Sequence, residues 1–224
     1  MLRDFFTSPN FLALLRFWEG ARAGRVVPDW NGDLAAIPTS LLSRIVVMER
    51  REALIYRYVG ILSKTRFGRD PTGVTVAETL SPGYAAYVAD LVETAVVGGA
   101  PVFSSSVLHQ DNLIRRTGRL VAPFTLRGSA APCVTMSAHL EVGDEFKVTE
   151  VLEPGGVLET QRIRISGVPD VCARLEEARR YHQLSRAVPD RSLASEWSGI
   201  AAQLGAGAIV PLGTFRNARD TDED

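Results

Sequence analysis

Five runs rich in β-branched residues, set around one helical section, constrain the fold of this chain more than any other feature. Two of the runs, 43–51 and 52–60, flank a polar turn and predict a hairpin. The other three lie at 101–110, 115–126 and 132–142, after the helical section. We therefore expect an α+β fold, with a five-stranded antiparallel sheet that carries its helices on one face.

Two segments have the residue spacing of amphipathic helices. Ser8 and Pro9 are typical of a helix start, and Ser81 and Pro82 repeat that signal ahead of a longer helix that should end at Gly98. In the first helix four apolar residues share one face: Phe11, Leu14, Leu15 and Trp18. This face must be covered by its own domain or by a partner, and we expect it to form the interface of a homodimer or of a signalling complex.

The composition is that of an ordinary globular protein. The chain has 224 residues, a formal net charge of −1, 46% apolar residues and 23% charged residues. No basic excess indicates nucleic acid binding, and no uncharged apolar run approaches the roughly 20 residues of a membrane span. Two cysteines and an amino-terminal stretch without the apolar core of a signal peptide favour a cytoplasmic setting.

The stretch YRYVG at 56–60 is followed by FGRDPTG at 67–73. Gly60 would let the chain leave the sheet edge, and Gly68 allows turn conformations that other residues avoid. Asp70 before Pro71 favours a turn, because the residue before proline avoids the helical region. These breaks predict a lid of short helical pieces, which can enclose a cavity that one long helix would fill.

These motifs together resemble a bacterial PAS-type family in which an amphipathic helix precedes the sheet. The elements that carry the resemblance are Phe17-Trp18, Pro28, residues 56–60, residues 67–73 and Gly99-Ala100-Pro101-Val102, so that it covers roughly residues 8–142. It implies a PAS-like five-stranded sheet, a pocket under the helices and a sensory or regulatory role in signal transduction. Some relatives hold haem through a pocket histidine, but the sequence requires no cofactor, and neither haem nor flavin is indicated.

The resemblance does not extend to residues 143–224, which we interpret as a carboxy-terminal extension. It should contain a hairpin that turns at residues 153–156, helices over 169–187 and 192–204, and the acidic tail RDTDED.

Aromatic residues of the strands and of the lid are the candidates for a ligand pocket. Tyr56 and Tyr58 should share a face by strand alternation, and Phe103 marks the inner face of its own strand. The complete set of predicted ligand-binding residues is Tyr56, Tyr58, Phe67, Phe103, Ser105, Val107, His109 and Phe124. A slip of one residue in register would exchange the two faces of a strand, and simple core packing is the alternative for each aromatic ring.

Other chemistry has weaker support. Ser105 and His109 lie about 13 Å apart on one strand, too far for a nucleophile and its base. His109, His139 and Cys133 lack the close spacing of metal ligands, so we predict no metal site. Arg116 or Arg119 could reach an anionic ligand or a partner, although a solvated surface is the usual role of such arginines.

We therefore expect a non-catalytic domain that binds a small molecule, a signalling partner or both. One alternative is a structural adaptor with the same fold, a filled core and no ligand. Another is an enzyme of the cone-shaped α+β type, which would need an acidic general base in its pocket. The predicted inner faces of the strands carry no clear carboxylate.

Overall fold

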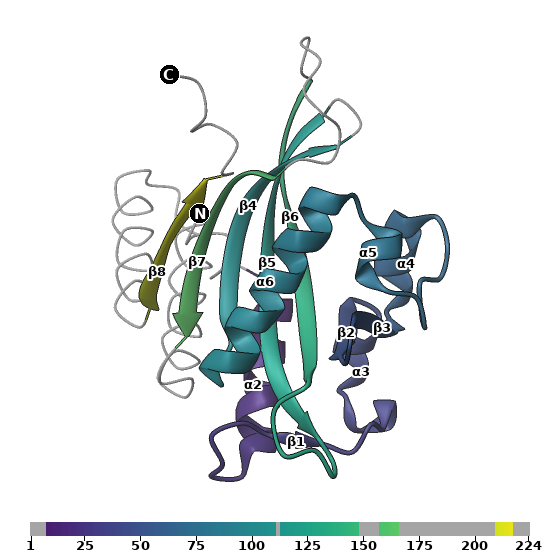
Figure 1. Ribbon diagram of the computed structural model, residues 1–224, viewed down its shortest axis with the longest axis vertical. Coiled ribbons are helices and arrows are strands. Elements are labelled where there is room, and N and C mark those ends of the chain that lie inside the picture. The colour runs from purple at the N-terminus through teal and green to yellow at the C-terminus, as the bar shows by residue number, and fades with distance from the viewer. Residues whose placement is uncertain (1–7, 111–112, 148–156, 166–208, 217–224) are drawn as a thin grey trace, which may run out of the picture.

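The chain folds around one large sheet. The computed structural model describes residues 8–110, 113–147, 157–165 and 209–216. Its strands are β1 (Asp29–Trp30), β2 (Ile45–Arg50), β3 (Leu54–Val59), β4 (Val102–Gln110), β5 (Leu113–Leu126), β6 (Val134–Lys147), β7 (Val157–Ile165) and β8 (Ile209–Arg216). The sheet has the order β3-β2-β6-β5-β4-β7-β8, and β1 pairs in parallel with β5 (Figure 1).

The α+β class is confirmed, and each of the five predicted runs contains a strand. These five are neighbours in the order β3-β2-β6-β5-β4, and every adjacent pair is antiparallel. The predicted number of strands is wrong, because the described sheet has more than five. The sheet has eight strands and is mixed, because β7 and β8 extend it beyond β4 and the short β1 joins β5 in parallel.

Helices cover both faces of the sheet, which corrects the prediction that they lie on one. They are α2 (Pro9–Arg22), α3 (Thr39–Leu42), α4 (Ile61–Phe67), α5 (Val76–Thr79) and α6 (Pro82–Gly98), with a 3-10 turn at Leu34–Ala36. Figure 1 shows α6 in front of the sheet and α2 behind it. Two separate apolar clusters result, one under α2 with Phe103 and Leu120, and one under α6 with Val102 and Val121.

The apolar face of α2 is part of the core of this chain. Phe11, Leu14 and Leu15 are fully buried, and Trp18 is 2% exposed. The Trp18 indole N–H donates to the Pro123 carbonyl oxygen at 2.6 Å, which fixes the helix to β5. These four side chains were predicted to meet a dimer partner, but the chain's own sheet already covers them.

A β-bulge changes the side-chain pattern of β3. Val47 pairs with Tyr58 and Met48 pairs with Tyr56, so Arg57 is an extra residue between two consecutive pairs. Tyr58 therefore packs in the cluster under α2, whereas Tyr56 packs in the cluster under α6. The prediction that the two tyrosines share a face is wrong for this reason.

The carboxy-terminal part of the sheet also differs from the prediction. β6 continues past residue 142 to Lys147, and β7 pairs with β4 and β8 instead of forming a hairpin with β6. The reason is that β4 offers a free edge, which β7 completes. The predicted helices at 169–187 and 192–204 and the acidic tail lie outside the described residues.

Candidate functional site

A group of polar side chains lies between α6 and the strands beneath it. Helical spacing places Tyr84 and Tyr87 three residues apart on α6, where their rings stack with centroids 5.8 Å apart. The strands contribute the rest of the group, which is Tyr56 from β3, Ser104 and Ser106 from β4, and Arg119 from β5. In the sheet Ser104 pairs with Arg119, so the serine and the arginine occupy one row of the sheet.

Arg119 is the charged residue of this group. Its side chain is enclosed, since the residue is 6% exposed. Its Nη2 atom donates to the Tyr84 hydroxyl at 2.6 Å, and its guanidinium carbon lies 5.4 Å from the centroid of the Tyr84 ring and 5.9 Å from that of Tyr87. Within the described part of the chain Arg119 forms no ion pair, although a buried charge is costly without one.

Glu49, the other strongly buried charged residue of the described chain, has charged partners. Glu49 is 5% exposed and lies between two arginines. It accepts from Arg51 Nε at 2.7 Å and forms an ion pair with Arg57. The contrast shows that this fold neutralises a buried carboxylate while it leaves the Arg119 guanidinium with a neutral phenol as its hydrogen-bonding partner.

Tyr56 is a further strongly buried residue on the α6 side of the sheet. The residue is 3% exposed, and its ring meets that of Phe67 edge to face with centroids 5.6 Å apart. No residue of the described chain forms a hydrogen bond with its hydroxyl group. Burial raises the pKa of Tyr56 to about 12, while the positive charge of Arg119 acts in the opposite direction. The hydroxyl group is therefore neutral near pH 7 and can act as a hydrogen-bond donor.

Hydroxyl groups line the β4 side of the site. The Tyr87 hydroxyl lies 2.8 Å from Ser104 Oγ, and Ser106 Oγ donates to it at 2.5 Å. Such a network holds the Tyr87 ring in one orientation and keeps the polar groups of β4 satisfied beneath α6. The site is thus built of one cation, three phenols and two serine hydroxyls, which are groups that bind and orient a polar molecule.

The predicted ligand-binding residues do not form one site. Tyr56 and Phe67 lie on the α6 side, as just described. Phe103 and Phe124 are buried on the α2 side, where Phe103 meets the Phe11 ring with centroids 5.6 Å apart. The Tyr58 hydroxyl donates to the Leu42 carbonyl oxygen at 2.8 Å, so Tyr58 is a packing residue as well.

Ser105 is partly exposed and alternates with Ser104 and Ser106, which puts it on the α2 side. Val107 and His109 pair with Arg116 and Ile114 in the sheet, and their side chains lie outside the described part of the structure. The face of β4 that was chosen as the inner one therefore lies on the α2 side. Its large ring packs against α2, and the opposite face, with Ser104 and Ser106, is the one that lies under α6.

Sequence reasoning missed Tyr84, Tyr87, Ser104 and Ser106 as members of a site. Tyr84 and Tyr87 lie in the helix predicted to begin at Pro82, and their spacing alone puts two phenols on one face. Arg119 had been considered as a contact for an anion. The missing information was the pairing of Arg119 with Ser104, which follows from strand register.

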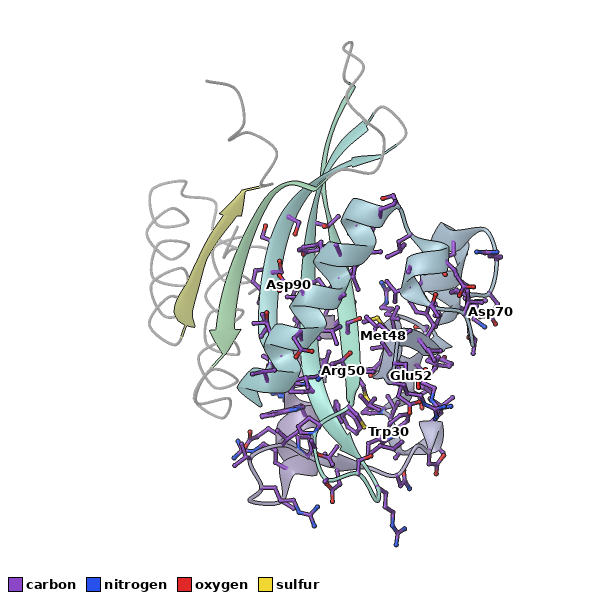
Figure 2. All side chains as sticks on the ribbon, viewed as in Figure 1. Trp30, Met48, Arg50, Glu52, Asp70 and Asp90 are labelled. Carbon is purple, nitrogen blue, oxygen red and sulfur yellow. The ribbon has the colours of Figure 1, made fainter. Side chains whose placement is uncertain are left out.

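The segment between α4 and α5 forms the outer rim of this region. Gly68 ends α4 in the left-handed conformation, with φ of 63°, as its place after Phe67 predicted. Asp70 follows, and it accepts from Lys64 Nζ and from the backbone N–H and the hydroxyl of Thr72. Figure 2 shows Asp70 at the edge of the molecule, apart from α6. The FGRDPTG motif therefore builds an ordered turn and contributes no charged group to the site under α6.

This turn should have a measurable pH response. The hydrogen bond from Lys64, followed by those from Thr72, lowers the pKa of Asp70 to about 2 from the ordinary 3.8. Because the folded pKa is the lower one, the turn is stabilised above pH 4 and loses that stabilisation as the pH falls toward 2. An NMR titration of the carboxyl group should give a midpoint near 2, and Lys64→Ala should raise it toward 3.8. An unchanged midpoint in the variant would contradict the assignment of Lys64 as the main cause.

Among the residues whose placement is described, no group of three or more His, Cys, Asp and Glu side chains is arranged to hold a metal ion. Within the same residues, no helix has both the length and the apolar character needed to cross a bilayer.

Comparisons with known proteins identify no relative of the chain. No protein-family model, no curated protein and no solved structure matches it.

Proposed function

We propose that this chain is a cytoplasmic, non-catalytic sensory or regulatory domain of PAS type, which binds a small molecule in the site under α6. Binding would be passed on to a partner protein or to a second copy of the chain by contact. One observation carries the proposal, namely that Arg119 is more than nine-tenths buried and forms no ion pair within the described chain, where its hydrogen bond goes to a neutral phenol. A buried charge is costly without a counter-charge, which a ligand would supply.

The arrangement of the strands supports the PAS assignment. The five predicted strands are contiguous and antiparallel, and α4 and α5 are short pieces, as the lid of such a domain requires. The helix α6 lies across this sheet (Figure 1) and provides two of the phenols of the site. A ligand held between α6 and β5 would therefore join the helical layer to the sheet.

The chemistry of the site supports binding over catalysis. A general base near neutral pH is most often a histidine or a carboxylate, and the described side chains around Arg119 are phenols and serine hydroxyls. The two carboxyl groups with a clear shift in pKa, Asp70 and Glu78, are both lowered, and both lie on the outer segment that includes α5. Such groups are ionised but far too weakly basic to serve as an efficient proton acceptor.

Native mass spectrometry of the purified chain, set beside the mass of the denatured chain, tests the proposal. We expect a species with added small-molecule mass that disappears on denaturation, and the same spectrum reports whether the chain is a dimer. A matched pair of variants locates the ligand, because Tyr56 and Tyr58 lie in one strand on opposite faces. Tyr56→Phe should lower the retained fraction, whereas Tyr58→Phe should leave it unchanged.

Two results would count against the proposal. A chain that never retains a small molecule would favour a structural adaptor with a filled core. Equal retention by the two variants would place the ligand elsewhere in the molecule.

A further inference from the structure

The charges of the site under α6 define the kind of molecule that it can hold. This argument rests on the proposed function, since it concerns the same site. Arg119 carries a positive charge in a position that is 6% exposed, and the only hydrogen bond it donates within the described chain goes to an uncharged phenol. A guanidinium has five N–H donors in a planar fork, so donors remain for a bidentate partner.

No carboxylate of the described residues forms an ion pair with Arg119, and the start of α6 lies beside it. Tyr84, its hydrogen-bonding partner, lies in the first turn of α6, which begins at Pro82. The amino-terminal end of a helix carries a partial positive charge from its free N–H groups. The guanidinium and this helix end therefore favour the same kind of partner, which is an anion.

Tyr56 adds a phenol to the same cluster. The residue is 3% exposed, and Tyr84 packs against the apolar cluster that contains it. A phenol whose pKa is about 12 is neutral near pH 7, so it can donate its proton to an acceptor.

Aromatic and apolar side chains surround these donors. The Tyr84 and Tyr87 rings stack on each other, and Phe67 packs against Tyr56. The same cluster contains Val88 and Leu91 of α6. These walls suit the apolar body of an organic molecule and lack the several cations that a polyphosphate would need.

We propose that the site under α6 binds a small organic carboxylate, whose carboxylate group pairs with the Arg119 guanidinium. The ligand would supply the counter-charge that the described chain leaves out. Its body would pack against the tyrosine rings of α6, so that α6 and β5 are joined by one molecule.

Thermal unfolding of the full chain with two pairs of probes tests this inference. Each pair consists of a carboxylate and its neutral amide of equal size, acetate with acetamide and benzoate with benzamide. A ligand that binds the folded state raises the midpoint of unfolding. We expect at least one carboxylate to raise it in the wild-type chain, and to bind roughly ten- to hundredfold more tightly than its amide, as for a charge-assisted hydrogen bond.

Variants of Arg119 provide the controls. Arg119→Gln should abolish the preference for the carboxylate over the amide. Arg119→Lys keeps the charge but loses the planar fork, so it should retain a weaker preference. Arg119→Lys also serves as the second variant if Arg119→Gln does not fold, which the melting curve without any probe reveals.

The results separate this inference from the proposed function. The inference that the ligand is a carboxylate would be wrong if the amides stabilise the chain as much as the carboxylates do. It would also be wrong if Arg119→Gln keeps the preference for the carboxylate. Neither result would contradict the proposal that the chain binds a small molecule. Stronger stabilisation by inorganic phosphate than by either carboxylate would also overturn the inference. If none of these probes binds and native mass spectrometry finds no retained molecule, both proposals fail.

Discussion

Replacement of Gly60 by alanine should destabilise the fold by roughly 3 kcal/mol or more, close to the upper limit for an overpacked site. Gly60 is buried at the junction of β3 and α4, where its φ of −62° is open to any residue. Space is the constraint at this position. A β-carbon would lie 2.4 Å from the Leu42 carbonyl oxygen and 2.5 Å from the Ser43 carbonyl carbon. Backbone atoms cannot move aside as the end of a side chain can, so the hairpin and α3 would have to separate.

Gly20 offers a matched control for this substitution. It lies inside α2, and a β-carbon at Gly20 would meet no atom within 4 Å. Gly20→Ala should therefore stabilise the chain, by about 0.5–1 kcal/mol, because alanine is the better helix former. Urea unfolding followed by far-UV circular dichroism measures both changes. Similar shifts of the same sign in the two variants would contradict the steric argument.

The result at Gly60 would also explain why the strand ends where it does. The Gly60 N–H donates to the Ile45 carbonyl oxygen at 2.8 Å, and the Leu62 N–H donates to that of Ser43 at 2.9 Å. The start of α4 is thus bonded to the segment that leads into β2. The glycine in YRYVG is needed for this close approach of two backbones, and the approach sets the direction in which the chain leaves the sheet.

Local patterns predicted the elements well. Alternation and β-branched content located the five strands β2 to β6, and the Ser-Pro signals located the starts of α2 and α6, at Pro9 and Pro82. These features depend only on residues that are close together in the chain, so a single sequence is enough to predict them. Which strands lie side by side in the sheet depends instead on pairing between segments that are far apart in the chain. The addition of β7 to β4 is such a long-range choice and was not predictable from either segment.

The faces of the strands were harder to predict than the strands themselves. The bulge at Arg57 reverses the expected relation of Tyr56 and Tyr58, and nothing in the sequence YRYVG marks it. The large ring of Phe103 was assigned to the pocket side, but it packs with Phe11 on the other face. When both faces of a sheet are covered, the size of a side chain no longer tells which face is which.

The residues of the site under α6 were anticipated only in part. Tyr56 and Phe67, which were predicted for a ligand pocket, lie on the α6 side, and their role in binding stays a prediction. Arg119 was considered for an anion. The buried position of Arg119 was not expected, because arginine on a strand is usually solvated. Its burial depends on α6, which lies across β5 and brings Tyr84 into contact with it. A tertiary contact of this kind joins residues 35 positions apart, which periodicity cannot reveal.

The largest expected effect of a single substitution is at Trp18, where alanine should cost about 3–5 kcal/mol of unfolding free energy. Trp18 is among the largest fully buried side chains of the chain and lies at the centre of the cluster under α2. Its removal would leave a cavity between α2 and β5 and would deprive the Pro123 carbonyl oxygen of its hydrogen bond at 2.6 Å. The contact of the Arg22 guanidinium with the indole ring, 5.3 Å from its centroid, would also be lost.

Two further variants divide this effect into its parts. Trp18→Phe keeps most of the apolar volume but removes the indole N–H, so it should cost less, about 1–3 kcal/mol for a buried acceptor left without its donor. Ile61→Ala serves as the control, because Ile61 is 63% exposed and its loss should change the stability by no more than about 0.5 kcal/mol.

Urea unfolding at several protein concentrations completes the test. If α2 were a dimer interface, Trp18→Ala would remove a concentration dependence and leave the stability of the monomer intact. If α2 is instead part of the core, as its burial indicates, the loss will be large and the same at every concentration.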